Sequence, residues 1–314
     1  MTANIREIRI ATRESRLALW QAEHVADRLR AHYPHIPVRL VPMTTRGDQI
    51  LDAPLARIGG KGLFIKELEQ AMTRGEADIA VHSMKDVGVH LPDGFRIAAI
   101  LPRENPHDAF VSNHYTSLAA LPQGARVGTC SLRRRMQLAR LRPDLQLLDL
   151  RGNVQTRLSK LDNGEYDAII LAAAGLQRLE LDERIRLILS EADSLPAAGQ
   201  GALGIEIAAH RTDLLDVLKP LNHDTTHACV TAERALARAL GGSCQVPLAA
   251  YCTEENGLLT LRGLVGHPDG SVILQADAQA PSAYADALGR AVAKKLADDG
   301  AQELIEAVLK EQAE

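Results

Sequence analysis

The chain has 314 residues, of which 46% are hydrophobic, and a formal net charge of −4 at pH 7. Its length exceeds that of one ordinary domain, so we expect two or three domains, with enough apolar residues to build their cores. The negative net charge argues against a general nucleic-acid-binding protein.

The four cysteines show neither CxxC nor Cys/His ligand spacing. This argues against a structural zinc site, so no metal is expected, and scattered cysteines in a long chain favour a reducing compartment. Residues 1–10 lack the apolar core of a secretory signal, and the longest apolar run, at 168–174, is far too short to span a bilayer. We therefore expect a soluble, cytoplasmic protein without a membrane partner.

The first hundred residues alternate between segments with strand and helix patterns. Strands are predicted at 8–11, 38–43 and 77–81, and helices at 17–29 and 63–72. Ser15 is the type of residue that caps a helix N-terminus. Such alternation predicts an α/β fold with a parallel, doubly wound sheet.

The same order of elements recurs from about residue 108. Residues 126–131 repeat the strand, threonine and serine of residues 10–15, with one residue fewer between Thr and Ser. Residues 164–170 echo residues 75–81 in the same way. We predict two similar α/β lobes, while coincidence between two generic strand–helix units remains the alternative.

The last third of the chain has a different pattern. A glycine-rich segment at 196–204 is predicted to be a hinge or a crossing back to the first lobe. Helices at 228–240, 283–297 and 302–310, with alternating strands at 258–265 and 272–276, then predict a small α+β domain. The expected domains are residues 1–101 with 202–219, residues 107–196, and residues 222–314.

One cysteine stands in an unusual loop. Residues 241–247 read Gly-Gly-Ser-Cys-Gln-Val-Pro and follow the predicted helix at 228–240. The glycines end that helix and allow a ligand to approach the backbone closely. Cys244 is therefore either a small structural side chain or a nucleophile or covalent attachment point.

Arginines gather just beyond the ends of the predicted strands. Ligands of open α/β sheets bind at those ends, where helix N-termini offer free N–H groups, and arginine pairs well with carboxylates. We therefore expect a ligand with several negative charges. Three consecutive helical residues cannot share one face, so one arginine of 133–135 should face solvent. The arginines in question are Arg13, Arg133, Arg134, Arg135, Arg151, Arg157 and Arg178.

Two further polar groups are candidates for chemistry. Lys85 and Asp86 follow the strand at 77–81, and such a carboxylate is either a structural counter-charge or a general acid/base. His82 is more simply interpreted as a core histidine than as a base. The loop with Gly59, Gly60 and Lys61 lacks phosphate-loop spacing and is predicted to be a mobile flap.

Together these motifs resemble the porphobilinogen deaminase (hydroxymethylbilane synthase) family. The matching stretches run in the family's order from residue 11 to residue 247. They lie at residues 11–13 with Ser15, 17–21, 45–48, 59–64, 78–86, 131–134, 150–153 and 199–201, and at Gly242 with Cys244.

The resemblance implies a three-domain fold and a reaction. Two lobes should resemble periplasmic anion-binding proteins, and a third domain should carry the cysteine matched by Cys244, which holds a dipyrromethane cofactor through a thioether. Enzymes of this family are transferases that join four porphobilinogen molecules head to tail through oligopyrrole intermediates and lose ammonia each time. Water then releases hydroxymethylbilane for haem and other tetrapyrrole biosynthesis.

The resemblance also implies residue roles. Asp86 matches the catalytic carboxylate. The cofactor-binding positions are matched by Cys244, Lys85, Thr129, Ser131, Arg133, Arg134, Arg151 and Arg157. The substrate-binding positions are matched by Arg13, Ser15, Gln21, Arg178 and Gln200, and the flap by Gly59, Gly60 and Lys61.

The chain departs from the family pattern at Gly88 and Arg16, where proline is usual or frequent, which puts local rigidity in doubt but no functional group. A non-enzymatic anion-binding protein is disfavoured by the Cys244 loop and the absence of a signal peptide. A nucleic-acid-binding protein is disfavoured by the net charge and the lack of interleaved aromatic residues. No oligomerisation stripe is evident, so a monomer is expected.

Overall fold

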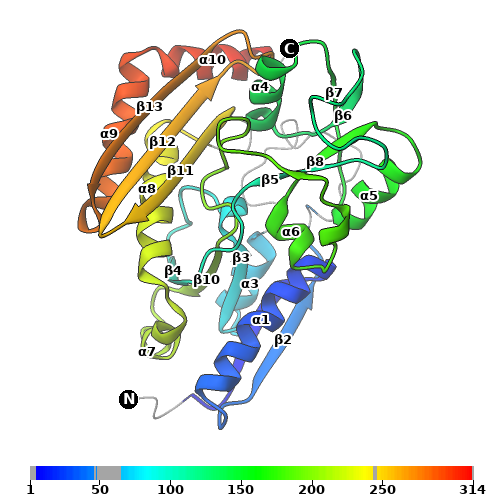
Figure 1. Ribbon diagram of the computed structural model, residues 1–314. Helices are drawn as coiled ribbons and strands as arrows, with labels where there is room; N and C mark the ends of the chain where they lie inside the picture. The colour runs from blue at the N-terminus through cyan, green and yellow to red at the C-terminus, as the bar shows by residue number, and fades with distance from the viewer. Residues whose placement is uncertain (1–4, 46, 48–64, 243–245, 313–314) are drawn as a thin grey trace. The chain divides into compact units, whose positions relative to one another are not determined.

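The computed structural model describes residues 5–45, 47, 65–242 and 246–312 (Figure 1). These residues form three β-sheets and divide into two compact units. Of the described residues, the first unit contains 5–45, 47, 65–103 and 202–227. The second contains 104–201, 228–242 and 246–312, with both the second α/β sheet and the C-terminal sheet. The division into three domains, with the boundaries given above, therefore stays a prediction.

The sheet of the first unit has the order β2-β1-β3-β10-β4. Its strands are β1 (Ile8–Arg13), β2 (Val38–Met43), β3 (Ile79–Ser83), β4 (Phe95–Ile100) and β10 (Leu203–Ala208). The strand β1 runs parallel to β2 and β3, as predicted, but β10 is antiparallel to β3 and β4. The sheet is mixed because β10 enters after the chain has crossed from the second unit, at residues 201–202.

Helix α1 (Arg16–His32) covers this sheet and confirms the first predicted helix. Ser15 is its N-cap, and its side chain accepts the N–H of Ala18. The buried face of α1 includes Val25 and Leu29, which share a core with Ile10 of β1. The unit also contains α3 (Lys66–Thr73), η2 (Met84–Asp86), α7 (Asp213–Leu218) and η4 (Lys219–Leu221).

The α/β sheet of the second unit has the order β7-β6-β8-β5-β9. Its strands are β5 (Asp108–Val111), β6 (Arg126–Gly128), β7 (Gln146–Leu148), β8 (Ala168–Ala172) and β9 (Leu187–Ile188). Here too three strands are parallel and β5 is antiparallel to its neighbours. The associated helices are α4 (Leu132–Leu141), α5 (Val154–Asp162), α6 (Ala173–Gln177) and η3 (Asp182–Arg184).

A repeated ion pair confirms that the two α/β sheets are built alike. Arg9 at the start of β1 donates from its backbone N and its Nε to Asp78, both at 2.9 Å. Arg126 at the start of β6 donates from the same two atoms to Asp167, at 2.7 and 3.4 Å. Each guanidinium also donates to a glycine carbonyl in the turn that precedes the third strand. The sequence echoes are therefore structural equivalents.

The C-terminal sheet is antiparallel, with the order β11-β12-β13. It consists of β11 (Leu248–Glu255), β12 (Leu258–Gly266) and β13 (Ile273–Pro281). Helix α8 (Asp224–Ala239) precedes these strands, and η5 (Ser282–Tyr284), α9 (Ala285–Asp298) and α10 (Ala301–Glu311) follow them. Figure 1 shows α9 and α10 along one face of this sheet. On α4, Met136 packs against Ala249 and Tyr251 of β11.

The fold is thus α/β, with two mixed sheets and a C-terminal α+β part. Among the helices of the described residues, none combines the length and apolarity needed to cross a membrane.

A buried polar cluster lies between α3 and the sheet of the first unit. His82 on β3 is 6% exposed, and its Nε2 lies 2.8 Å from Oε2 of the fully buried Glu206 on β10, which confirms His82 as a core histidine. Glu69 on α3 is partly buried nearby. Burial, and next the charge of Glu206, raise the pKa of Glu69 to about 7, against an opposing effect of His82.

This raised pKa makes stability depend on pH. Folded Glu69 holds its proton over a pH range in which the unfolded chain has lost it, so its contribution is present below pH 4.5 and is lost as pH rises through about 7. We expect Glu69→Gln to raise the free energy of unfolding at pH 8 by about 1 kcal/mol, a value discounted for partial exposure. Denaturant titrations between pH 5 and 8 would measure the difference.

Glu7→Gln is the matched control, because Glu7 is exposed in the same unit and pairs only at the surface with Arg39. That variant should show no gain that grows with pH. A constant difference between Glu69→Gln and the unmodified chain across this range would contradict the prediction.

Candidate functional site

The first unit gathers four of the predicted residues at one edge of its sheet. Since β1 and β3 are parallel neighbours, their carboxyl ends lie at the same edge. Arg13 is the last residue of β1, and Ser15 caps the helix that follows. Lys85 and Asp86 occupy η2, directly after β3. Asp86 is exposed, whereas Arg13 and Lys85 are half-buried, so the carboxylate is accessible from this edge.

Gln21 lies deeper in the same unit. Its side chain on α1 is 5% exposed, and Nε2 donates to the Ser83 hydroxyl at 3.0 Å. Gln21 therefore ties α1 to the end of β3, next to η2. The two positions where proline is usual in the family are both exposed: Arg16 is the first residue of α1, and Gly88 follows η2.

The second unit presents a hydroxyl pair after β6. Ser131 is the N-cap of α4, and its Oγ accepts the backbone N–H of Arg134 at 3.4 Å. The Oγ1 of Thr129 accepts the backbone N–H of Ser131 at 3.2 Å. These contacts fix the first turn of α4, where free N–H groups and the helix dipole favour a negative ligand.

Two predicted arginines flank the start of α5. Arg151 precedes Gly152, whose φ of 109° suits glycine and where a Cβ would lie 2.6 Å from the side chain of Thr156. Asn153 caps the helix. Arg157 donates from Nε to the carbonyl of Gly152 at 2.7 Å. Both arginines are half-buried, so this second helix start also combines cations with a positive dipole end.

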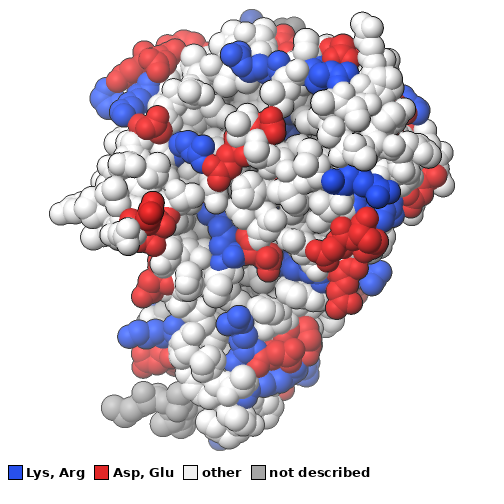
Figure 2. All heavy atoms as spheres, in the orientation of Figure 1, with Lys and Arg blue, Asp and Glu red and all other residues white. Residues whose placement is uncertain are grey.

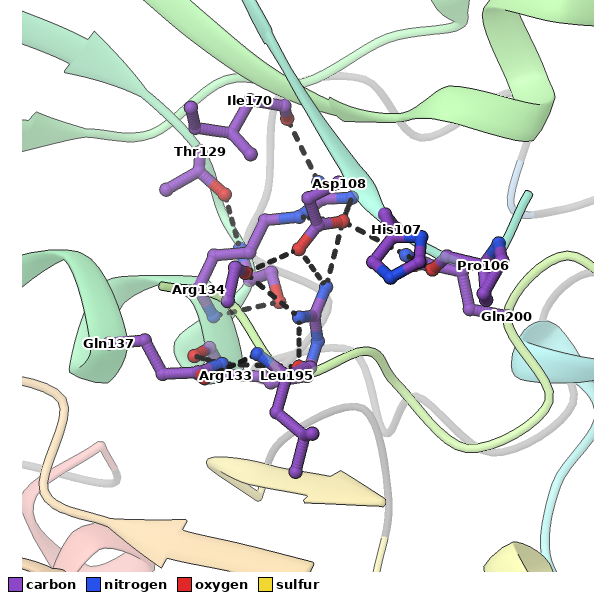
Figure 3. Close-up of polar contacts among 12 residues, drawn as sticks. Pro106, His107, Asp108, Thr129, Arg133, Arg134, Gln137, Ile170, Leu195 and Gln200 are labelled. Carbon is purple, nitrogen blue, oxygen red and sulfur yellow. Dashed lines mark hydrogen bonds and ion pairs between the residues drawn. The ribbon is translucent and has the colours of Figure 1, made fainter. Parts of the chain in front are cut away.

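Arg133 and Arg134 meet at one buried carboxylate (Figure 3). Asp108, the first residue of β5, is fully buried, and the two arginines are 4% and 6% exposed. Arg133 Nη2 lies 2.8 Å from Oδ2 of Asp108. Arg134 donates from Nε at 3.0 Å and from Nη2 at 2.7 Å to Oδ1. Burial alone would raise the pKa of Asp108, but the two guanidinium charges outweigh it and hold that pKa below its ordinary value.

The prediction that one of the three consecutive arginines faces solvent is met by Arg135. Arg135 is half-buried and donates from Nη2 to the exposed Asp149 at 2.8 Å.

Gln200 and Arg178 lie beside the buried cluster. Gln200 is 1% exposed and donates from Nε2 to Oδ1 of Asp108 at 3.0 Å and to the carbonyl of Pro106 at 2.6 Å. Arg178 donates to the carbonyl of Gly201 at 2.7 Å, and burial lowers its pKa to about 10. A Cβ at Gly201, whose φ is 85°, would overlap the carbonyl oxygen of Glu104, so this turn requires glycine.

Sequence reasoning missed two buried carboxylates of the second unit. One is Asp108, which starts a fully buried strand, and a charge at the head of an apolar run is the signal that could have found it. The other is Glu233 on α8, which is fully buried and accepts the backbone N–H groups of Gly199 at 2.7 Å and Cys252 at 2.8 Å. Glu233 thereby links α8 to the segment that contains Gln200.

Several predicted positions lie outside the described residues: Cys244 and the flap positions Gly59, Gly60 and Lys61. Of the other cysteines, Cys130 is half-buried and Cys229 and Cys252 are buried. Within the ranges that the structure describes, no group of His, Cys, Asp and Glu side chains is arranged to hold a metal ion. Figure 2 shows Lys and Arg interspersed with Asp and Glu on the displayed face.

The arrangement suits a ligand rich in carboxylates. Fixed guanidinium groups, capped helix starts and hydroxyls lie at the strand ends of the second unit, and an accessible carboxylate lies at the equivalent edge of the first. The individual roles assigned to these residues stay predictions.

Comparisons with known proteins identify the family. Residues 8–216 match the family model "Porphobilinogen deaminase, dipyromethane cofactor binding domain", and residues 227–298 match "Porphobilinogen deaminase, C-terminal domain". The porphobilinogen deaminase of Neisseria meningitidis serogroup B is 74% identical over 306 residues, which are 98% of each chain. That of Chromobacterium violaceum is 65% identical over 305 residues, covering 97% of this chain and 99% of the relative.

Solved structures give more distant similarities. The periplasmic aliphatic sulphonate binding protein of Escherichia coli is 14% identical with a TM-score of 0.42, over 75% of this chain and 71% of that one. A periplasmic substrate-binding protein of an ABC transporter from Coxiella burnetii is 13% identical with a TM-score of 0.43, over 68% and 91%. With both family models matched in order and a relative 74% identical over almost the whole length, the chain belongs to the porphobilinogen deaminase family.

Proposed function

We propose that the side chains at the strand ends carry out the reaction of this family. The chain is a transferase that condenses four porphobilinogen molecules head to tail onto a dipyrromethane cofactor, with loss of ammonia, and hydrolysis then releases hydroxymethylbilane. The observation that carries this conclusion is the match of both family models and of curated relatives over nearly the full chain.

The residues described here fit the dipyrromethane group. Each of its pyrroles carries an acetate and a propionate, so it needs cations and N–H donors in fixed places. The second unit supplies Arg151 and Arg157 at the start of α5 and the buried arginines of α4. When bound through Cys244, the group supplies the pyrrole end to which each new substrate is joined. Lys85, Thr129 and Ser131 are proposed as its further contacts.

Asp86 is the proposed catalytic residue. It is exposed on η2, so a substrate can reach its carboxylate. Loss of ammonia leaves positive charge on the substrate, and a carboxylate placed at a pyrrole N–H stabilises that charge and can take up a proton. Arg13, Ser15 and Arg178 are proposed to bind the acid arms of the substrate. Gln21 and Gln200 are also proposed to contribute to substrate binding, and the side-chain amide of each donates a hydrogen bond within its own unit.

The partners, the oligomeric state and the cellular location of the chain follow from the same proposal. Porphobilinogen and its oligopyrrole products are the small-molecule partners. We propose that the chain works as a cytoplasmic monomer and uses neither nucleic acid nor a membrane. The mixed charges on the face displayed in Figure 2 form no broad basic patch there, which supports the part of this proposal that concerns nucleic acid.

Replacing the catalytic carboxylate should separate binding from chemistry. We expect Asp86→Asn to keep KM within a few-fold and to lower kcat by about 100-fold or more, because the amide neither neutralises the developing charge nor accepts a proton. Porphobilinogen consumption by protein shown by mass spectrometry to carry the cofactor would measure both constants.

Asp93→Asn is the control, because Asp93 is an exposed aspartate of the same unit that lies outside η2. It should leave both constants unchanged. Normal turnover by fully loaded Asp86→Asn would refute the assigned role.

The attachment point can be tested by mass alone. We expect the unmodified chain to carry a surplus of two pyrrole units confined to the peptide that contains Cys244, and Cys244→Ser to be folded without it. Cys130→Ser, which removes a partly exposed thiol next to Ser131, should keep the surplus. A chain that binds carboxylates without any covalent pyrrole would favour the non-enzymatic anion-binding alternative.

A further inference from the structure

We propose that Asp108 is a positioning residue that fixes the guanidinium groups of Arg133 and Arg134 for the carboxylates of the cofactor. This inference rests on the proposed function, in which these two arginines contact the dipyrromethane group. Asp108 touches neither substrate nor cofactor in this proposal, and it acts through the arginines.

Both carboxylate oxygens of Asp108 are saturated by donors (Figure 3). Its Oδ2 accepts from Ser194 Oγ at 2.7 Å and pairs with Arg133 at 2.8 Å. Its Oδ1 accepts from Nε and Nη2 of Arg134 at 3.0 and 2.7 Å, and from Gln200 at 3.0 Å. A carboxylate held from this many directions cannot turn, so it is a rigid reference point for the groups around it.

Each guanidinium is also anchored from a second side. Nη1 of Arg133 donates to the carbonyl of Leu195 at 2.7 Å, and Nη1 of Arg134 donates to the carbonyl of Ile170 at 2.9 Å. Two-point anchoring sets the plane of each planar guanidinium before any ligand arrives. The entropy cost of ordering the arginines is therefore met by folding rather than by binding.

The charge of Asp108 matters as much as its geometry. Two guanidinium groups bring two positive charges and Asp108 brings one negative charge, so the buried cluster presents one net positive charge. Without the carboxylate, two like charges would be buried side by side, and such groups move apart or towards solvent. Asp108 thus keeps both cations in place while leaving attraction for a carboxylate ligand.

The cluster also lies on a contact path to the helix that precedes the cysteine loop. Gln200 contacts Asp108, and the adjacent Gly199 donates its N–H to Glu233 on α8 at 2.7 Å. Helix α8 ends at Ala239, shortly before Cys244 in the sequence. Asp108 is therefore placed to align the arginines with the element that leads to the attachment point.

The test measures cofactor loading of folded protein. Apo forms of the unmodified chain, Asp108→Asn and Asp108→Glu would be incubated with porphobilinogen at a temperature at which circular dichroism shows each to be folded. Intact mass then gives the fraction that carries two extra pyrrole units. We expect loading of Asp108→Asn to fall at least five-fold, and Asp108→Glu, which restores the charge, to recover more than half of it.

Asp167→Asn is the matched control, because Asp167 pairs with an arginine in the same unit but precedes the amino end of β8, whereas Asp108 lies beside Ala172 at the carboxyl end of that strand. It should lower the melting temperature and leave loading unchanged. If Asp108→Asn also melts earlier but loads fully, Asp108 is merely structural and the inference is overturned.

Two further variants keep the outcomes distinguishable. If Arg133→Ala and Arg134→Ala load normally, the proposed role of the arginines fails, and the role of Asp108 fails with it. If they lose the cofactor while Asp108→Asn keeps it, only the present inference fails. Should Asp108→Asn not fold, Ser194→Ala is the deciding variant, because it removes one donor to the Asp108 carboxylate without changing the charge. We expect this variant to load the cofactor about three-fold more slowly. An unchanged loading rate overturns the inference.

Discussion

The second unit depends on one buried ion pair cluster, in which Asp108 holds Arg133 and Arg134. Removing a partner from such a cluster costs about 3–5 kcal/mol, because it leaves a charge buried without compensation. The cluster therefore forms only when the start of β5, the first turn of α4 and the segment near Ser194 arrive together. A local requirement for charge satisfaction thus fixes where three distant segments meet, and with them the proposed anion site.

The two α/β sheets share one architecture but differ in the residues that follow the third strand. Both use an Arg–Asp pair to hold the first and third strands, and both cap the following helix with serine. They differ after the third strand. In the first unit β3 leads into η2 with the exposed Asp86, whereas in the second β8 leads into α6, whose corresponding residues are small and neutral. The two sheets thus share a frame, and the residues after the third strand place an exposed carboxylate in the first unit where the second unit has small neutral side chains.

Local features were predictable from the sequence, and distant pairings were not. Residue type and helical or strand spacing predict the cap at Ser15 and the core role of His82. They also predict that one arginine of 133–135 faces solvent, but not which one. By contrast, Glu206 reaches His82 from 124 residues away, and Gln200 reaches Asp108 from 92. The antiparallel direction of β10 and β5 was missed for a related reason, since strand direction depends on where the chain crosses between units. The roles of Cys244 and the flap came from the resemblance, and those residues lie outside the described part of the chain.

The chain is acidic overall, yet its proposed ligand is an acid that gains carboxylates with every substrate added. The buried cluster on α4 contributes one net positive charge and cannot balance this growth by itself. Arg13, Arg151 and Arg157 differ from it because they are half-buried at strand ends and helix starts, so part of each side chain is exposed. The guanidinium groups of the buried cluster are fixed by folding, whereas half-buried cations are accessible to a ligand that lengthens. Burial, rather than residue type, therefore divides the arginines proposed to contact the cofactor, because Arg133 and Arg134 are buried while Arg151 and Arg157 are half-buried.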